Sequence, residues 1–220
     1  MASLNRHRLV WLSAQAWAEQ AAAQRCDAEA LACLQHWAAH GLPLVVTRQP
    51  QPRDTGTIDL GLAAPARWGR RRLFLSAPRA QVERVGDFPQ ARDMEPQLPA
   101  AARGAWTTLC ADLAASGLSP RVFGSHGWQW LTGLDHVHAR SDIDLLIACP
   151  SQEQADQASA ILQRAPPTLP RLDGELVFDG GAAVAWREWA AWRAGRTATV
   201  LVKRLHAAAL EDPHTWTVMA

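Results

Sequence analysis

Two short motifs in the second half of the chain carry residue types suited to metal-assisted phosphoryl chemistry. Gly124-Ser125 ends one apolar segment, and Asp142-Ile143-Asp144 begins another. Side chains alternate along a strand, so Asp142 and Asp144 should point to one face and Ile143 to the other. Two carboxylates on one face repel each other, and burying them without a cation is costly. A divalent cation such as Mg²⁺, which prefers carboxylate oxygens, removes that cost.

The glycine and serine supply the complement of the two acids. A glycine lets the backbone approach a phosphate closely, and exposed N–H groups together with the Ser125 hydroxyl can hold a polyphosphate chain. The two motifs therefore predict phosphoryl transfer, with Asp142 and Asp144 as metal ligands and Mg²⁺ as the cofactor. Gly124 and Ser125 are the predicted substrate-binding residues.

A two-metal site needs a further carboxylate to activate the attacking hydroxyl. The segment RLDGELVF (171–178) offers Asp173 and Glu175, which alternate onto one face of a strand. Gly174 between them can instead mark a bulge, which would place the two acids on different faces. We favour Asp173, nearer the start of the strand, and leave Glu175 as the alternative.

Strand and helix patterns alternate through the second half, which predicts an α/β (α+β) fold. The predicted strands there are 121–124, 141–148, 171–178 and 198–205, and the predicted helices are 99–116, 127–131, 151–164 and 184–193. In the first half a helix capped by Asp27 should run to residue 39. Strands are expected there at 42–49, 57–63 and 70–77.

Prolines 89, 96 and 99 lie among polar residues and indicate a domain boundary. We expect a small mixed N-terminal domain, residues 1–95, followed by a catalytic domain, residues 96–220, whose mixed sheet is covered by helices. The tryptophans at 128 and 130, and those at helical spacing at 186, 189 and 192, are expected to be core or interface anchors.

Composition excludes several classes of function. The formal net charge is +1, so no overall field attracts nucleic acid or an anionic membrane. No apolar stretch approaches the ~18 residues of a membrane-spanning helix, and the N-terminus does not resemble a secretory signal. The four cysteines show no metal-binding spacing, which favours reduced thiols and a cytoplasmic location.

The order GS…DIDLL, with a third carboxylate on a later strand, resembles the signature of the polymerase-β-like nucleotidyltransferase superfamily over residues 105–205. A narrower resemblance spans nearly the whole chain. The segments GSHGWQWLTGLDHVHARSDIDLLI, DGELVF, AVAWREW and VLVKR are similar to the phosphoribosyl-dephospho-CoA transferase of malonate decarboxylase, also called its holo-acyl-carrier-protein synthase. WAAHGLPLVVTRQ and IDLGLA fit the N-terminal region of that family.

That resemblance implies a reaction and its partners. The substrate would be 2′-(5″-triphosphoribosyl)-3′-dephospho-CoA, and the acceptor a serine of the acyl carrier protein subunit of malonate decarboxylase. The serine attacks the α-phosphorus and pyrophosphate leaves. The resemblance implies that Gly124 and Ser125 hold the β- and γ-phosphates, and that Lys203 or Arg204 neutralises the pyrophosphate. The N-terminal domain would bind substrate or carrier protein.

Other charged side chains are weaker candidates. His126 and Arg140 flank the two motifs and are predicted phosphate contacts. A basic cluster is predicted either to receive the substrate or the acidic carrier, or to be a solvated strand flank; it comprises Arg67, Arg70, Arg71, Arg72 and Arg79. Three alternatives to the main hypothesis remain: an ATP-dependent nucleotidyltransferase, a nucleotide-sugar glycosyltransferase, and a non-catalytic module that binds a carrier protein.

Overall fold

The N-terminal half forms a five-stranded antiparallel sheet. The structure, a computed structural model, describes residues 5–23, 26–49 and 56–216. The strands lie in the order β4-β3-β2-β1-β5. They are β1 (Leu9–Leu12), β2 (Leu44–Val46), β3 (Thr57–Ala63), β4 (Arg72–Pro78) and β5 (Val82–Gly86).

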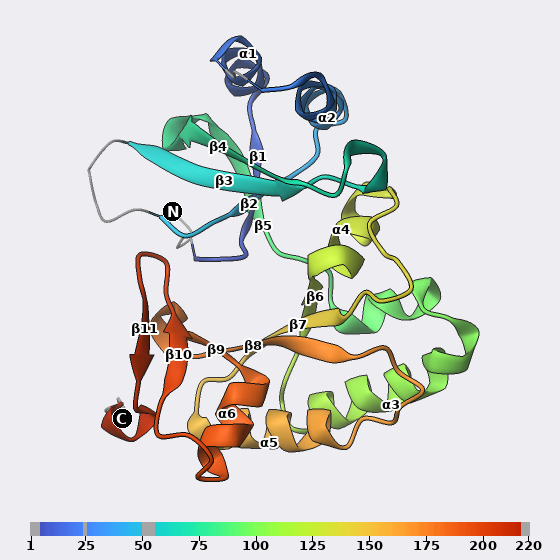
Figure 1. The fold of residues 1–220 in the computed structure, drawn as a ribbon, viewed down its shortest axis with the longest axis vertical. Coiled ribbons are helices and arrows are strands. Elements are labelled where there is room, and N and C mark those ends of the chain that lie inside the picture. The colour runs from blue at the N-terminus through green and yellow to red at the C-terminus, as the bar shows by residue number, and fades with distance from the viewer. Residues whose placement is uncertain (1–4, 24–25, 50–55, 217–220) are drawn as a thin grey trace.

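Two helices cover one face of this sheet, α1 (Ala14–Ala23) and α2 (Ala28–Ala39) (Figure 1). Helix α2 begins where its sequence predicts, because the Asp27 side chain accepts a hydrogen bond from the Ala30 N–H and caps the first turn. Its Trp37 is fully buried in the core beneath the helices. The other face of the sheet is turned toward the C-terminal half (Figure 1).

The C-terminal half forms a six-stranded mixed sheet in the order β11-β10-β9-β8-β7-β6. Only β7 and β8 pair in parallel among the described strands. The strands are β6 (Arg121–Phe123), β7 (Ile143–Ala148), β8 (Leu172–Val177), β9 (Ala183–Ala185), β10 (Val200–Lys203) and β11 (Ala208–Glu211). The α+β class predicted from the sequence is confirmed.

Helices α3 (Ala100–Ala115), α5 (Gln152–Gln163) and α6 (Trp186–Arg193) lie on the sheet face away from the N-terminal half (Figure 1). The alternation of β7 explains this layering, because Ile143, Leu145 and Ile147 are buried in the core against these helices. Asp144 therefore points to the opposite face, toward the N-terminal sheet. Helix α4 (Gly124–Thr132) follows β6 directly and lies beside that face.

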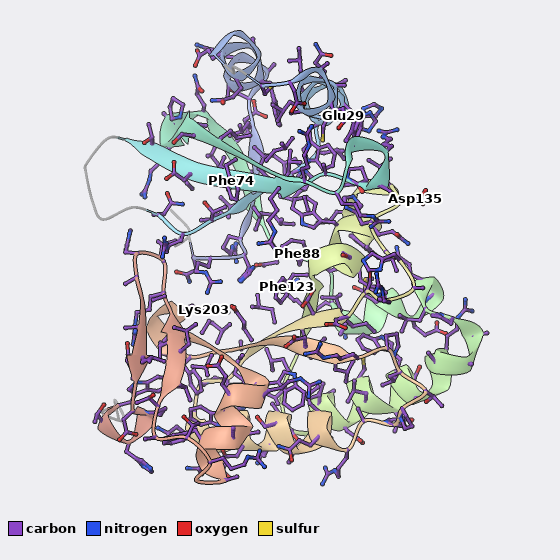
Figure 2. All side chains as sticks on the ribbon, viewed as in Figure 1. Glu29, Phe74, Phe88, Phe123, Asp135 and Lys203 are labelled. Carbon is purple, nitrogen blue, oxygen red and sulfur yellow. The ribbon has the colours of Figure 1, made fainter. Side chains whose placement is uncertain are left out.

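The two halves are packed against each other through α4. Its Trp128 is buried in the core of the N-terminal half, with ring centroids 6.2 Å from Trp37 and 5.7 Å from Phe88. Figure 2 shows Phe88 and Phe123 between the two sheets. The prediction of an interface anchor is confirmed for Trp128, but it is wrong for Trp130, which is 44% exposed.

Short elements escaped prediction. Strands β1, β5, β9 and β11 and helix α1 have no counterpart among the predicted elements, and the helix expected from residue 184 begins at Trp186 because β9 precedes it. A 3-10 helix, Ala91–Gln97, spans the proposed boundary at residue 95 and buries Ala91 and Met94 in the C-terminal core. Among the described residues, no helix is both long and apolar enough to cross a bilayer.

Candidate active site

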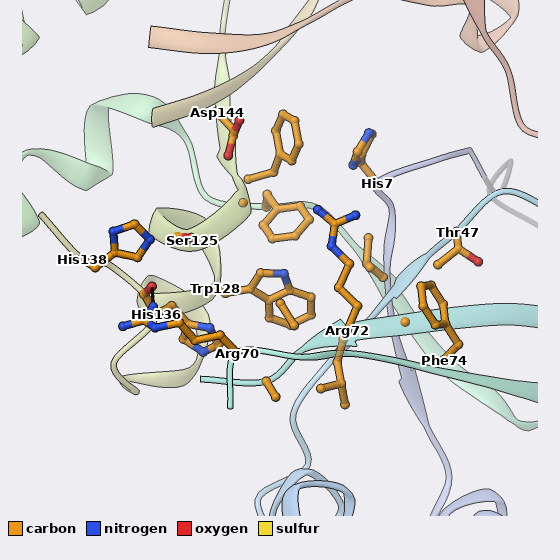
Figure 3. A pocket seen from close by; sticks show the side chains of 18 residues that line it. His7, Thr47, Arg70, Arg72, Phe74, Ser125, Trp128, His136, His138 and Asp144 are labelled. Atoms are coloured by element: carbon orange, nitrogen blue, oxygen red, sulfur yellow. Dashed lines mark hydrogen bonds between the residues drawn. The ribbon is translucent and has the colours of Figure 1, made fainter. Parts of the chain in front are cut away.

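A pocket of about 510 Å³ lies between the two sheets and is lined by residues of both predicted motifs (Figure 3). Gly124, Ser125 and Asp144 line it from the C-terminal half. Arg72 and Phe74, on β4, line it from the N-terminal sheet. The structure therefore brings the glycine–serine motif and one acid of the Asp-Ile-Asp motif into a single cavity, as the sequence predicted.

Contact between the two motifs is enforced by backbone geometry. Strands β6 and β7 are antiparallel, with Phe123 opposite Asp144, so Gly124 emerges beside the Asp144 carboxylate. Gly124 has φ 61°, and a Cβ at this position would lie 1.9 Å from Asp144 Oδ2. Only glycine permits both the left-handed backbone and this approach. Helix α4 begins at Gly124, so the pair lies in its first turn, whose N–H groups have no acceptor within the helix.

Substituting Gly124 with alanine should separate the motifs. We expect Gly124→Ala to destabilise the fold by about 1–2 kcal/mol through its left-handed backbone, and to lower group transfer roughly a hundredfold by displacing Asp144. Gly133→Ala is the matched control, because Gly133 ends the same helix at φ 67° with nothing within 4 Å of the added Cβ. Urea unfolding and transfer rates measure both effects. Equal losses of transfer in the two variants would contradict the proposed contact.

The three acids of the site share one sheet face. The β7–β8 register is unbroken and places Asp144 opposite Asp173, so Gly174 marks no bulge. Instead, a Cβ at Gly174 would lie 1.9 Å from the Leu145 carbonyl oxygen. Arg171 reaches Asp142 at 3.4 Å and Asp173 at 3.6 Å. A single exposed guanidinium thus offsets two of the three carboxylates.

Asp144, in contrast, forms no ion pair within the described residues. Burial, followed by the charges of Asp173, Asp142 and Glu175, raises its pKa to about 6 against a smaller opposing effect of Arg72. A divalent cation bound beside Asp144 would offset the repulsion among these carboxylates and favour the ionised form of Asp144.

The oxygen donors present suit Mg²⁺, although no three His, Cys, Asp or Glu side chains in the described part of the chain form a metal cage by themselves. Mg²⁺ is usually held by one or two carboxylates and completes its shell with water and substrate phosphates. Asp142 and Asp144 meet that requirement.

Glu175 lies on the same face but is engaged elsewhere. Its carboxylate accepts hydrogen bonds from Arg6 at 3.3 Å and from Lys203 at 2.9 Å, and lies 3.1 Å from His7 Nε2. Burial would raise the pKa of Glu175, but His7, Arg6 and Lys203 outweigh it and hold the pKa well below its usual value. Glu175 therefore joins the N-terminal segment to the C-terminal sheet, whereas Asp173 pairs with the exposed Arg171.

The remaining predicted residues lie away from the pocket. His126 is buried in α4, and neither ring nitrogen has a hydrogen-bond partner in the described structure. The Arg140 side chain is exposed. Lys203 is bound to Glu175, and Arg204 forms an ion pair with Glu211. None of these four lines the cavity that contains Gly124 and Asp144, and of the four predicted acids only Asp144 does.

The basic cluster divides in the structure. Arg71 pairs with Asp27 on the outer surface, Arg67 lies over the Trp68 ring, and Arg79 donates to the Thr57 carbonyl. Arg70 and Arg72, in contrast, line the pocket.

Sequence reasoning missed the pocket residues His7, His136 and His138. Only the tertiary packing of the two halves brings them to one cavity.

His136 gives the protein a dependence on pH. It is buried beside Trp128, and burial followed by the charge of Arg70 lowers its pKa to about 4, against a smaller effect of Asp135. Between pH 6.5 and 4, His136 therefore binds a proton in the unfolded chain but stays neutral in the folded protein. Stability should fall as the pH drops through this window, by at most about 1.4 kcal/mol per pH unit. Unfolding free energies of wild type and His136→Gln should converge on acidification; parallel curves would contradict this.

Two family models together match most of the chain. The family models for the N-terminal and C-terminal domains of phosphoribosyl-dephospho-CoA transferase MdcG match residues 5–88 and 89–214. A phosphoribosyl-dephospho-CoA transferase of Xanthomonas axonopodis pv. citri is 40% identical over 199 residues, covering 90% of this chain and 89% of that protein. One from Bradyrhizobium diazoefficiens is 33% identical over 213 residues, covering 95% and 90%.

A further relative with the same name, from Pseudomonas putida, is 34% identical over 185 residues, 82% of this chain and 83% of that protein. No solved structure matches the chain. Both halves of the chain match the two domains of one family in order, and the relatives align over most of their length. The chain therefore belongs to the phosphoribosyl-dephospho-CoA transferase MdcG family and is a transferase.

Proposed function

We propose that the protein transfers the phosphoribosyl-dephospho-CoA group from 2′-(5″-triphosphoribosyl)-3′-dephospho-CoA to a serine of the malonate decarboxylase acyl carrier protein, with release of pyrophosphate. Membership of the family supports the group transferred. The carrier protein and the pyrophosphate follow from the resemblance and from the chemistry of the pocket. With four free cysteines, we place the reaction in the cytoplasm.

The observation that carries the proposal is the contact between the glycine–serine turn and the acid pair. Gly124 and Asp144 are packed so closely that no other residue fits at position 124. A phosphate chain held by the N–H groups of the turn and the Ser125 hydroxyl therefore lies against the carboxylates. This juxtaposition serves phosphoryl transfer, in which positioning and charge neutralisation supply most of the rate.

The side chains then have separate roles. Gly124 and Ser125 hold the β- and γ-phosphates and so align the α-phosphorus with the acids. Asp173, which lies opposite Asp144 on β8 and has a side chain that is 35% exposed, accepts the proton of the attacking serine hydroxyl. Its exposure suits an acceptor carried on another protein. Arg171 balances Asp142 and Asp173 before substrate arrives.

Mg²⁺ is the proposed cofactor, with Asp142 and Asp144 as its protein ligands. When bound, it neutralises charge that develops on the phosphate oxygens. The N-terminal sheet forms the opposite wall of the pocket, and we propose the N-terminal domain, residues 1–95, as a binding domain for substrate or carrier protein. Residues 96–220 supply the proposed catalytic groups.

Intact-mass spectrometry of the acceptor tests the proposal. The protein is incubated with purified apo carrier subunit, Mg²⁺ and the triphosphoribosyl precursor. We expect the carrier to gain the mass of one phosphoribosyl-dephospho-CoA group and pyrophosphate to appear in equal amount. A carrier in which the acceptor serine is replaced by alanine is the control.

Two other results would overturn the proposal. An unchanged carrier mass would remove the acceptor assignment. A gain of one AMP when ATP replaces the precursor would identify an ATP-dependent nucleotidyltransferase instead.

A further inference from the structure

Arg72 is the cation of the N-terminal sheet that faces the acid side of the pocket. It begins β4 and pairs with Ala63 of β3 at the end of a seven-residue antiparallel register. In Figure 3 its guanidinium extends from β4 toward the side on which Asp144 and Ser125 lie. All three residues line the same cavity.

The neighbouring arginines have partners, whereas the Arg72 side chain has no ion pair or hydrogen bond within the described residues. Arg70 donates to the His136 carbonyl oxygen at 2.5 Å, and Arg71 is paired with Asp27. A guanidinium carries five N–H donors in a planar fork, which suits two oxygens of one phosphate. An unpaired guanidinium that lines the same pocket as the Gly124–Ser125 turn therefore suits a phosphate group.

The walls around Arg72 are fixed from both ends of the pocket. Arg70 ties the N-terminal half to the loop before β7, and His7 ties it to Glu175 on β8. Both residues have a positive φ, 53° for Arg70 and 65° for His7, and they are the only such non-glycine residues in the described part of the chain. Backbone strain of this kind persists where the surroundings impose it, typically around ligand sites. The wall of the pocket that carries Arg72 is therefore fixed relative to the C-terminal half, and the exposed Arg72 side chain extends from it.

We propose that Arg72 binds the terminal phosphates of the triphosphate, so that the substrate bridges the two domains. The inference rests on the proposed function. In this proposal Arg72, on the N-terminal sheet, neutralises the charge of the leaving pyrophosphate. The family resemblance had implied Lys203 or Arg204 for that role. Those two side chains are occupied by Glu175 and Glu211.

Binding of inorganic tripolyphosphate, measured by titration calorimetry in the presence of Mg²⁺, tests the inference without the carrier or the precursor. We expect Arg72→Ala to weaken binding about ten- to a hundredfold, the usual loss for a charge-assisted hydrogen-bonded pair. Arg72→Lys should fall in between, because lysine keeps the charge and loses the fork. Arg196→Ala is the control, since Arg196 is exposed in the loop after α6 and should bind like wild type.

The outcomes separate this inference from the proposed function. Tripolyphosphate affinity unchanged in Arg72→Ala, or absent in wild type, would overturn the role of Arg72. A rise in KM for the carrier alone would reassign Arg72 to the acceptor protein and also overturn it. Arg72-dependent tripolyphosphate binding by a protein that fails to modify the carrier would support the phosphate site and refute the proposed reaction.

Discussion

Asp144→Asn is expected to lower group transfer by about a thousandfold or more while the protein stays folded. The substitution keeps the size of the side chain and removes the charge that binds the cation. A bound cation stabilises the transition state by several kcal/mol, so losing it should slow the reaction strongly. Burial and neighbouring acids raise the pKa of Asp144, so its charge destabilises the folded state near neutral pH. The variant should therefore unfold at the same or a higher urea concentration than wild type.

A matched control is Asp179→Asn, in the exposed turn after β8. It should keep full transfer activity and stability. Initial rates of carrier modification and urea midpoints, measured on both variants, separate a role in the reaction from a role in folding. Retention of more than a tenth of the wild-type rate by Asp144→Asn would show that this carboxylate is an ordinary strand-end acid.

Glu175→Ala should cause the largest loss of stability, about 3–5 kcal/mol, because it leaves the cations around a buried acid without their partner. The Glu175 side chain is only 7% exposed and joins Arg6, His7 and Lys203. Urea unfolding at neutral pH measures the loss. Glu83→Ala, on the exposed face of β5, is the control and should change stability little. A Glu175→Ala loss no greater than that of the control would show that Glu175 does not hold the N-terminal segment to the C-terminal sheet.

The pH dependence gives an independent check on Glu175. Because its pKa is lowered on folding, its ionised form stabilises the protein above the ordinary value of 4.5, and this contribution is lost as the pH falls below it. The stability difference between wild type and Glu175→Gln should shrink over that range. Glu175→Gln should also keep most of its transfer activity, whereas Asp173→Asn should lose at least about a hundredfold.

The sequence predicted that Gly124, Ser125 and Asp144 lie together because the features that indicate it are local. The side to which Asp144 points follows from strand alternation, and the Gly124–Ser125 turn follows from its glycine, so both depend on neighbouring residues. Helix α2 was likewise predictable from its Asp27 cap. Strands as short as β9, with three residues, show no measurable period, and so they were missed.

Ion-pair partners that lie far apart along the chain could not be predicted from the sequence. The choice between Asp173 and Glu175 depends on Arg6 and Lys203, which lie far from either acid along the chain. In the sequence Arg72 is one of several arginines in a basic run. Only the structure shows that Arg70 and Arg71 have partners and that the Arg72 side chain lines the pocket without one. His126 and Arg140 were chosen for their nearness in sequence to the motifs, but they do not line the pocket.

Anomalous diffraction from crystals grown with Mn²⁺ and inorganic tripolyphosphate tests whether the two motifs form one metal and phosphate site, since Mn²⁺ replaces Mg²⁺ and can be located unambiguously. We expect an anomalous peak within bonding distance of the Asp142 and Asp144 carboxylates, with the phosphate chain on the Gly124–Ser125 turn. A peak elsewhere, or tripolyphosphate bound away from that turn, would contradict it.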